Sequence, residues 1–314
     1  MADTHASFPT AWRSQSGYSL VEMMVAVAVL MIVSNTVFSG ILGMTNVSRS
    51  VSNRSEMHSG VRNANELLQQ EIGQAGLISL PAPTILSAGV AAGTGNATVS
   101  SAAGMFVGQY LAVGTGDLEE TVLLTDVNTA TNQITATFLN THAANSPVAA
   151  VGGFSSGVVP PSATDGSSGS TLKLFGDIND DGAMVYVEYI CDTAGGNLYR
   201  NAMPIGTLAK PAVTVRHVLL TNIEPNPDGT PCFTYLQKTV DGTAFVVNVA
   251  VTLTVRTQTP DPITGAFQRE TKALLNVAPR NVYYVWQLAS QSNTNRVQPT
   301  PPSVLTLLPS SVAQ

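Results

Sequence analysis

One stretch of the chain limits its possible folds more than any other. Residues 18–44 are almost entirely apolar and carry a single charge, on Glu22. As an α-helix rising about 1.5 Å per residue, this stretch would be about 40 Å long, which is enough to cross a bilayer. A lone carboxylate in such a segment is costly unless it has a partner, so it indicates a function. We therefore expect a membrane helix in which Glu22 has a specific role.

The residues around Glu22 resemble the processing signal of type IV prepilins. In that family a peptidase cuts after a glycine, the new N-terminal amine is methylated, and the fifth residue of the mature chain is glutamate. Here Gly17 precedes the apolar stretch, and Glu22 is the fifth residue counted from Tyr18. The resemblance implies cleavage between Gly17 and Tyr18 and methylation of the Tyr18 amine. Family members usually begin with Phe, so Tyr18 is a mild departure.

An ordinary secretory signal peptide or a plain membrane anchor is the alternative interpretation. A secretory signal has a basic N-terminal region and a small-residue cleavage site after its apolar segment. Within residues 1–17, Arg13 is the only basic side chain besides His5, and Gly17 stands before the apolar segment. This order of features favours the prepilin signal.

Glu22 also has a physical role that does not depend on the family. Cleavage after Gly17 would leave a charged amine on Tyr18 among apolar helices. In a staggered bundle of parallel helices, Glu22 of one subunit can face the Tyr18 amine of the next. Loss of one partner would leave an unpaired buried charge, at a cost of about 3–5 kcal/mol. We expect Glu22 to direct subunit assembly.

The N-terminal part divides into a leader and one long helix. Residues 1–17 are the predicted leader, residues 18–44 the membrane-spanning half of the helix, and residues 45–80 its amphipathic half. Apolar residues recur every three or four positions in the second half, as on a helix that packs on a sheet. Gly76 is the predicted C-cap. Glycines and short polar residues in the first half leave both a continuous and a locally unwound helix open.

The remainder of the chain reads as β-structure. Residues 84–157 contain no Lys or Arg and alternate short apolar runs with turn residues, so we expect a small inserted β-domain. Residues 158–288 contain the strands of an antiparallel head, and residues 289–314, rich in Ser, Gln and Pro, are predicted to be disordered. The expected fold class is α+β, pilin-like, with a long N-terminal transmembrane helix packed on an antiparallel sheet and an inserted all-β unit.

One polar motif matches the spacing of a calcium loop. The template places oxygen ligands at positions 1, 3, 5, 7 and 12 and glycine at position 6. The residues at the ligand positions are Asp177, Asn179, Asp181, Ala183 (through its carbonyl) and Glu188. Both flanks read as strands rather than helices, so an Asx-rich turn is the alternative. Calcium is thus a candidate ligand, and no cofactor is required.

The two cysteines, Cys191 and Cys232, both lie on predicted strands of the head. An exported head would be in a compartment that permits a disulfide. We expect these two residues to be joined, with two separate buried thiols as the alternative.

Several functional classes are disfavoured by composition. The chain carries 14 Lys and Arg against 20 Asp and Glu, for a net charge of −6. This balance argues against direct binding to nucleic acid, which needs clustered basic residues. The sequence Gly153-Phe154-Ser155-Ser156-Gly157 matches a hydrolase nucleophile motif but has no helical pattern after it, and no His/Cys cluster has zinc spacing. We do not expect an enzyme.

Further segments resemble the PilW-like minor pilins of type IV pili, namely residues 67–76, Tyr189 followed by residues 198–200, and residues 277–281. The resemblance implies a protein of the bacterial inner membrane, with its head in the periplasm, that enters the extracellular pilus near its tip and primes assembly. The implied partners are prepilin peptidase and other major and minor pilins, contacted through the N-terminal helix. A minor pseudopilin of a type II secretion system shares the same N-terminal features. A surface adhesin or binding module on a membrane anchor is the alternative from another class.

Overall fold

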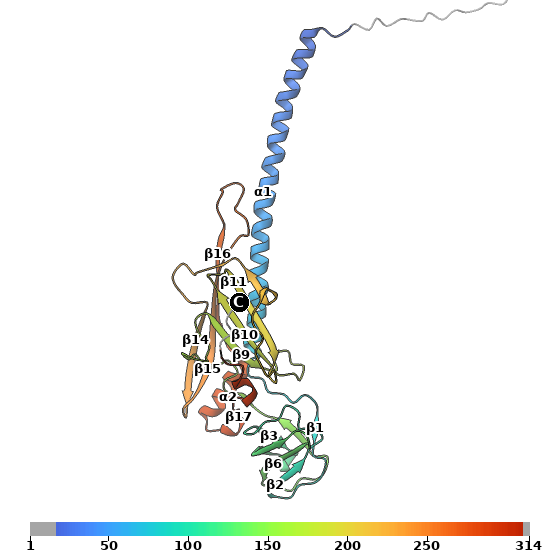
Figure 1. The fold of residues 1–314 in the computed structure, drawn as a ribbon, viewed down its shortest axis with the longest axis vertical. Helices are drawn as coiled ribbons and strands as arrows, with labels where there is room; N and C mark the ends of the chain where they lie inside the picture. Colours follow the sequence, from blue (N-terminus) through green and yellow to red (C-terminus); the bar gives the residue numbers. More distant parts are fainter. Residues whose placement is uncertain (1–16, 310–314) are drawn as a thin grey trace, which may run out of the picture. The chain divides into compact units, whose positions relative to one another are not determined.

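The computed structural model describes residues 17–309, so almost all of the predicted leader lies outside the described residues. Helix α1 (Leu20–Gln74) is continuous through its glycines (Figure 1), which decides against local unwinding. It stops before the predicted limit at residue 80. Gly76 adopts a φ of +84°, in the left-handed region, and its N–H donates to the carbonyl of Phe175 at 2.9 Å. The predicted C-cap at Gly76 therefore ends the helix and turns the chain toward the sheet.

Two compact units divide the chain. The first holds α1 up to Ser52 together with residues 261–266, and the second holds residues 53–260 and 267 onward. Within the first unit, the Ser50 hydroxyl donates to Asp261 at 3.3 Å. The segment 261–266 therefore contacts α1 in this unit.

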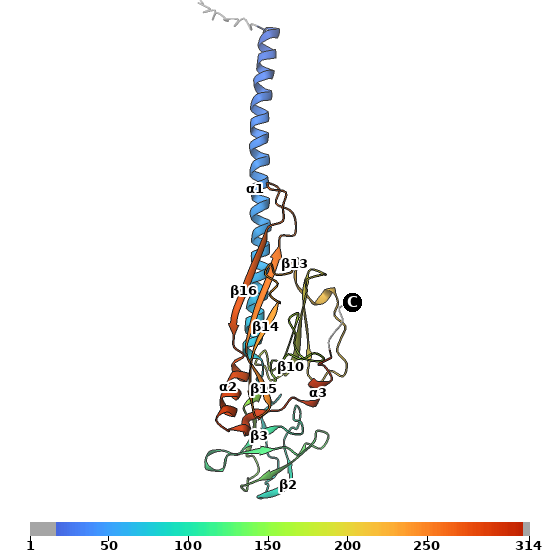
Figure 2. The same cartoon turned by 90° about the vertical axis from the view of Figure 1, so that its left-hand side faces the viewer.

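The head in the second unit has two antiparallel sheets. In the first, with strand order β12-β11-β10-β9, the strands are β9 (Thr171–Gly176), β10 (Val185–Asp192), β11 (Asn197–Pro204) and β12 (Val218–Thr221). In the second, the strands are β13 (Ile223–Glu224), β14 (Phe233–Val240), β15 (Thr243–Arg256) and β16 (Arg269–Val277). Figure 2 shows β15 beside β14 and β16, and β15 pairs with both. The predicted α+β, pilin-like fold is confirmed.

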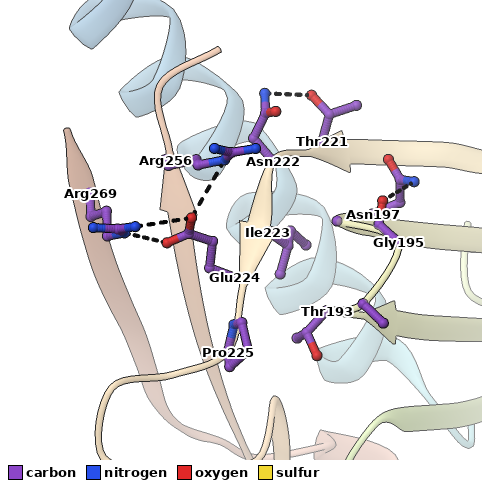
Figure 3. Close-up of a pocket in the computed structure, with 12 residues that line it drawn as sticks. Thr193, Gly195, Asn197, Thr221, Asn222, Ile223, Glu224, Pro225, Arg256 and Arg269 are labelled. Atoms are coloured by element: carbon purple, nitrogen blue, oxygen red, sulfur yellow. Dashed lines mark hydrogen bonds and ion pairs between the residues drawn. The ribbon is translucent and has the colours of Figure 1, made fainter. Parts of the chain in front are cut away.

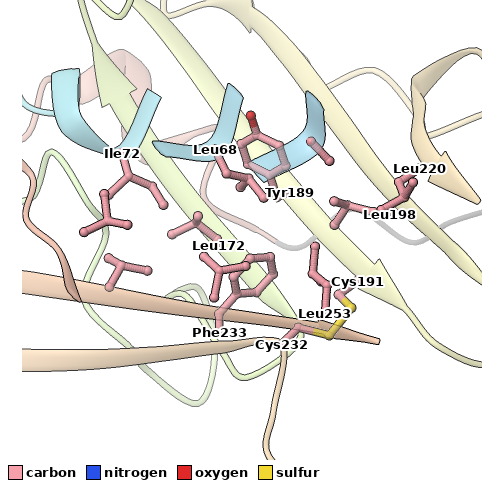
Figure 4. Close-up of a cluster of buried hydrophobic side chains, with 14 of the residues drawn as sticks. Leu68, Ile72, Leu172, Tyr189, Cys191, Leu198, Leu220, Cys232, Phe233 and Leu253 are labelled. Atoms are coloured by element: carbon pink, nitrogen blue, oxygen red, sulfur yellow. A yellow bond between two sulfur atoms is a disulfide. The ribbon is translucent and has the colours of Figure 1, made fainter. Parts of the chain in front are cut away.

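The second half of α1 and both sheets share one hydrophobic core. The helix contributes Leu68 and Ile72, both with no exposed surface, and these lie among side chains from both sheets (Figure 4). Strand β10 contributes Tyr189 and β14 contributes Phe233. Burial of a Leu or Ile side chain contributes about 1.5–3 kcal/mol, so this core holds the head to the helix.

The inserted β-unit has its own hydrophobic core. Its strands are β1 (Thr84–Ile85), β2 (Gly93–Thr98), β3 (Tyr110–Val113), β4 (Glu120–Leu123), β5 (Asp126–Asn128), β6 (Gln133–Phe138) and β7 (Pro147–Ala150). They form two small sheets, with orders β1-β7-β3-β4 and β2-β6-β5. A buried cluster that includes Leu111, Ile134 and Phe138 fills the space between them. A separate strand, β8 (Gly153–Phe154), follows, and Phe154 packs instead in a cluster with the head residues Phe175 and Tyr186.

The prediction of a disordered tail from residue 289 is wrong for its described part. The C-terminal elements are α2 (Arg280–Ser290), the 3₁₀ turn η3 (Thr294–Arg296), β17 (Val297–Gln298) and α3 (Pro302–Leu305). Val304 and Leu307 are fully buried beside Phe154 and Phe175. Strand β17 pairs in parallel with β8, and the Gln298 amide donates to the carbonyl oxygens of Tyr110 and Val151. A few buried side chains and the buried Gln298 amide order this polar stretch by joining the inserted unit to the head.

Candidate functional site: the start of the N-terminal helix

Ser19 starts α1 by capping it. Its hydroxyl accepts a hydrogen bond from the Glu22 N–H at 3.2 Å, and its carbonyl accepts one from the Met23 N–H at 3.2 Å. A serine in this position satisfies backbone donors that the helix cannot pair. Glu22 lies in the first turn, where a negative side chain interacts favourably with the helix dipole. Glu22 is therefore held in the first helical turn by local interactions.

The predicted cleavage site precedes this cap. Gly17 and Tyr18 lie outside the helix and are exposed, and a Cβ atom on Gly17 would meet nothing within 4 Å. Both residues of the predicted scissile bond are therefore exposed. Cutting there would leave the new amine on Tyr18, directly before the capping serine.

The apolar surface after Glu22 is unpacked within its unit. Leu30 and Ile32, with 64% and 68% of their surface exposed, are typical of a segment in which nothing from residue 17 to 52 is buried. By length and composition, α1 has an apolar segment able to cross a membrane. Such a surface is stable in lipid or against other apolar helices. Within residues 17–309, Glu22 has no ion-pair partner.

A second carboxylate of α1, Glu71, is buried, whereas Glu22 is exposed. The sequence analysis did not identify Glu71 as a buried charge. Only 3% of Glu71 is exposed. The Arg200 Nε donates to it at 3.0 Å, and the Tyr189 hydroxyl also donates to it. Burial, together with the Glu71 charge, raises the pKa of Tyr189 above its ordinary value. The signal that was available is the position of Glu71 in the sequence beside the apolar residues Leu68 and Ile72, which are buried in the core.

The calcium-loop residues are not arranged around an ion site. Both carboxylate oxygens of Asp177 accept backbone N–H groups, from Asp181 at 3.0 Å and Gly182 at 2.9 Å, while Ala183 donates to Asp181. Glu188 lies along β10, where Lys210 Nζ is 3.0 Å away. Within residues 17–309 no group of three or more His, Cys, Asp or Glu side chains could hold a metal ion. Asn179 is exposed, and the bond from the Ala183 N–H to Asp181, two residues earlier, is that of an Asx turn within this Asx-rich loop.

The disulfide joins the two sheets of the head. Cys191 on β10 is bonded to Cys232, which immediately precedes β14 (Figure 4). The two positions are 41 residues apart, and closing a loop of that size stabilises a fold by about 4 kcal/mol in the chain-entropy model. It therefore contributes to the head rather than to the N-terminal site.

Comparison with known protein families gives a match at the site just described. Residues 12–34 match the family model of the prokaryotic N-terminal methylation motif. No curated protein matches the chain. The motif covers Gly17, Tyr18 and Glu22, implies processing by prepilin peptidase and assembly with other pilins, and is consistent with membrane anchoring by α1. Together with the α+β architecture, it supports a type IV pilin-like protein.

Proposed function

We propose that the chain is a minor pilin of a type IV pilus, held in the bacterial inner membrane before it enters the filament. The observation that carries the proposal is the register of Gly17, Tyr18 and Glu22 at the start of an exposed apolar helix. Cleavage before Tyr18 places an amine and a carboxylate in the first turn of the mature helix. Neither group needs a partner from its own chain if neighbouring subunits supply one.

Assembly then pairs charges between subunits. The Tyr18 amine of one chain meets Glu22 of its neighbour inside a bundle of apolar helices, where an unpaired charge costs about 3–5 kcal/mol. This requirement sets the axial register between helices, because a sliding helix would separate the two charges. The apolar surface between residues 20 and 52 supplies the attraction, and the pair supplies the register.

A place near the filament tip is supported by the composition of the second unit. The inserted β-unit has its own core and is joined to the head by Gln298. If the subunit were repeated along a filament, every position in the filament would need space for this unit. A subunit present once, near the end, has no such constraint. In this position the chain would prime assembly with other minor pilins.

Mass spectrometry of the mature protein tests the first step. We expect an N-terminus at Tyr18 carrying one methyl group, which adds about 14 Da. Gly17→Ile should leave the chain uncleaved, while Gly40→Ile, at a helix position with equal space around it, should be processed normally. An N-terminus after the apolar segment, near residues 36–40, would contradict the proposal.

Purified filaments test the second step. We expect the chain in them at low copy number and at their ends, and we expect its deletion to reduce piliation. If the processed chain is absent from pili and its loss instead blocks protein secretion, it is a type II pseudopilin and the pilus assignment is wrong.

A further inference from the structure

A polar cavity of about 630 Å³ lies in the second unit. The turn between β10 and β11, the segment from β12 to β13, and the ends of β15 and β16 surround it (Figure 3). Its charged lining residues are Glu224, Arg256 and Arg269.

The two arginines make this cavity unusual. Arg256 on β15 and Arg269 on β16 are directly opposite each other in the strand register. Like charges in that position destabilise a sheet. Glu224 lies between them: its Oε1 is 3.5 Å from Arg256 Nε, and Arg269 donates to its other oxygen. One carboxylate thus serves two guanidinium groups, and the cavity keeps one uncompensated positive charge.

Arg256 is oriented to bind a further anion. Its guanidinium carbon is 4.3 Å from the centre of the Phe267 ring, which fixes the plane of the group. Within residues 17–309, the Arg256 guanidinium has no ion-pair partner besides Glu224, which contacts it through Nε. Its terminal N–H groups form the fork that binds a carboxylate through two parallel hydrogen bonds.

Most of the remaining lining is short, polar and uncharged. It includes hydroxyl and amide side chains and two glycines, namely Thr193, Thr221, Asn197, Asn222, Gly195 and Gly196, and the smaller apolar part is formed by Ala194, Ile223 and Pro225. Hydroxyls and amides offer both donors and acceptors, as sugar hydroxyls require. A lipid or apolar ligand would need a predominantly apolar lining, which this cavity lacks.

We propose that this cavity binds a carboxylated sugar, such as a uronic acid residue at the end of a glycan. The sugar carboxylate bridges the terminal nitrogens of Arg256 and the free edge of Arg269, and the ring hydroxyls contact the threonine and asparagine side chains. One excess positive charge matches the single carboxylate of such a sugar, whereas an acidic peptide would bring several. This site uses none of Gly17, Tyr18 and Glu22, and it does not depend on the pilin assignment.

The test is calorimetric titration of the full chain in neutral detergent at low salt with a glucuronic acid disaccharide. We expect saturable binding at about millimolar concentration. Arg256→Gln should weaken it about tenfold or more, because a charge-assisted contact is lost. Lys238→Gln removes the same charge from an exposed position on β14 outside the cavity and should leave binding unchanged.

Glu224→Gln should have the opposite effect on disaccharide binding from Arg256→Gln. Removal of the competing carboxylate should strengthen disaccharide binding about fivefold, since a like charge about 4 Å from the ligand is eliminated. Equal binding of a neutral glucose disaccharide, or no difference between Arg256→Gln and wild type, would overturn the proposal. Tighter binding of a glutamate-rich peptide than of the disaccharide would overturn it in favour of a protein ligand.

Discussion

The two halves of α1 share one backbone conformation but differ in what surrounds them. No side chain from residue 17 to Ser52 is buried, whereas the later half buries Met57, Val61, Leu68 and Ile72 in the head core. Each half carries one distinctive carboxylate: Glu22 is exposed, and Glu71 is buried against Arg200. Helix formation by itself is therefore not informative about burial. The second half finds its partners within the chain, and the first half must find them in lipid or in other subunits.

The largest expected effect is the loss of filament incorporation on substitution of Glu22, which lies in the first half of α1. Glu22→Ala should insert into the membrane normally, because the segment becomes more apolar, but should fail to enter filaments, because the Tyr18 amine of the neighbour loses its partner. The measurement is the amount of the chain in membranes and in sheared pili. Glu66→Ala, at an exposed position of the second half, is the matched control and should assemble normally. Normal incorporation of Glu22→Ala would refute the pairing.

Leucine truncations test the difference in packing. Leu68→Ala should lower the free energy of unfolding of the head by about 2–5 kcal/mol, because it leaves a cavity in a fully buried site. Leu30→Ala, at a position with 64% of its surface exposed, should leave that free energy unchanged. Denaturant unfolding of the full chain in detergent, followed by near-UV circular dichroism, measures both. An equal loss in the two variants would show that the first half also packs within the chain.

Substitutions of Glu71 and Glu22 should differ in their effect on the stability of the head, by a smaller amount than the leucine truncations. Glu71→Gln should destabilise the head by about 2 kcal/mol, since Arg200 loses its charged partner; the partial exposure of Arg200 limits the loss. Glu22→Gln should not change head stability. Adding Arg200→Gln to Glu71→Gln measures the coupling between the two residues. A coupling near zero would mean that the pair contributes no stability and that Glu71 is held by Tyr189 alone.

Glycine substitutions give the smallest effect. Gly73→Ala should stabilise the head by about 0.5–1 kcal/mol, because alanine favours helix and a Cβ at this position meets nothing within 4 Å. Gly43→Ala has the same free space but should not change head stability, because its half of α1 does not fold with the head. Thermal unfolding of the two variants side by side measures this. A rise in melting temperature for Gly43→Ala would show that the two halves of α1 unfold as one cooperative unit.

Local signals carried much of the prediction. The span of α1, its end at Gly76 and the strands of the head follow from apolar periodicity and from glycine, which depend on neighbours in the chain. Helix α2 was missed although Val282, Val285 and Ala289 recur at helical spacing and form its buried face. The tail was assigned as disordered because its composition is polar, yet Val304 and Leu307 in its described part are fully buried in a hydrophobic cluster.

The sequence by itself determined the processing signal, because Gly17, the helix cap at Ser19 and Glu22 all lie within six consecutive residues. Only the tertiary structure decided which charged groups meet. Glu71 and Arg200 are 129 residues apart, and Glu224 and Arg269 are 45 apart, so their pairing depends on how strands and helix pack. A single sequence specifies which residues can be charged or apolar, while long-range packing sets the surroundings of each charge. For that reason Glu22 could be singled out from spacing, whereas the arginine cavity could not.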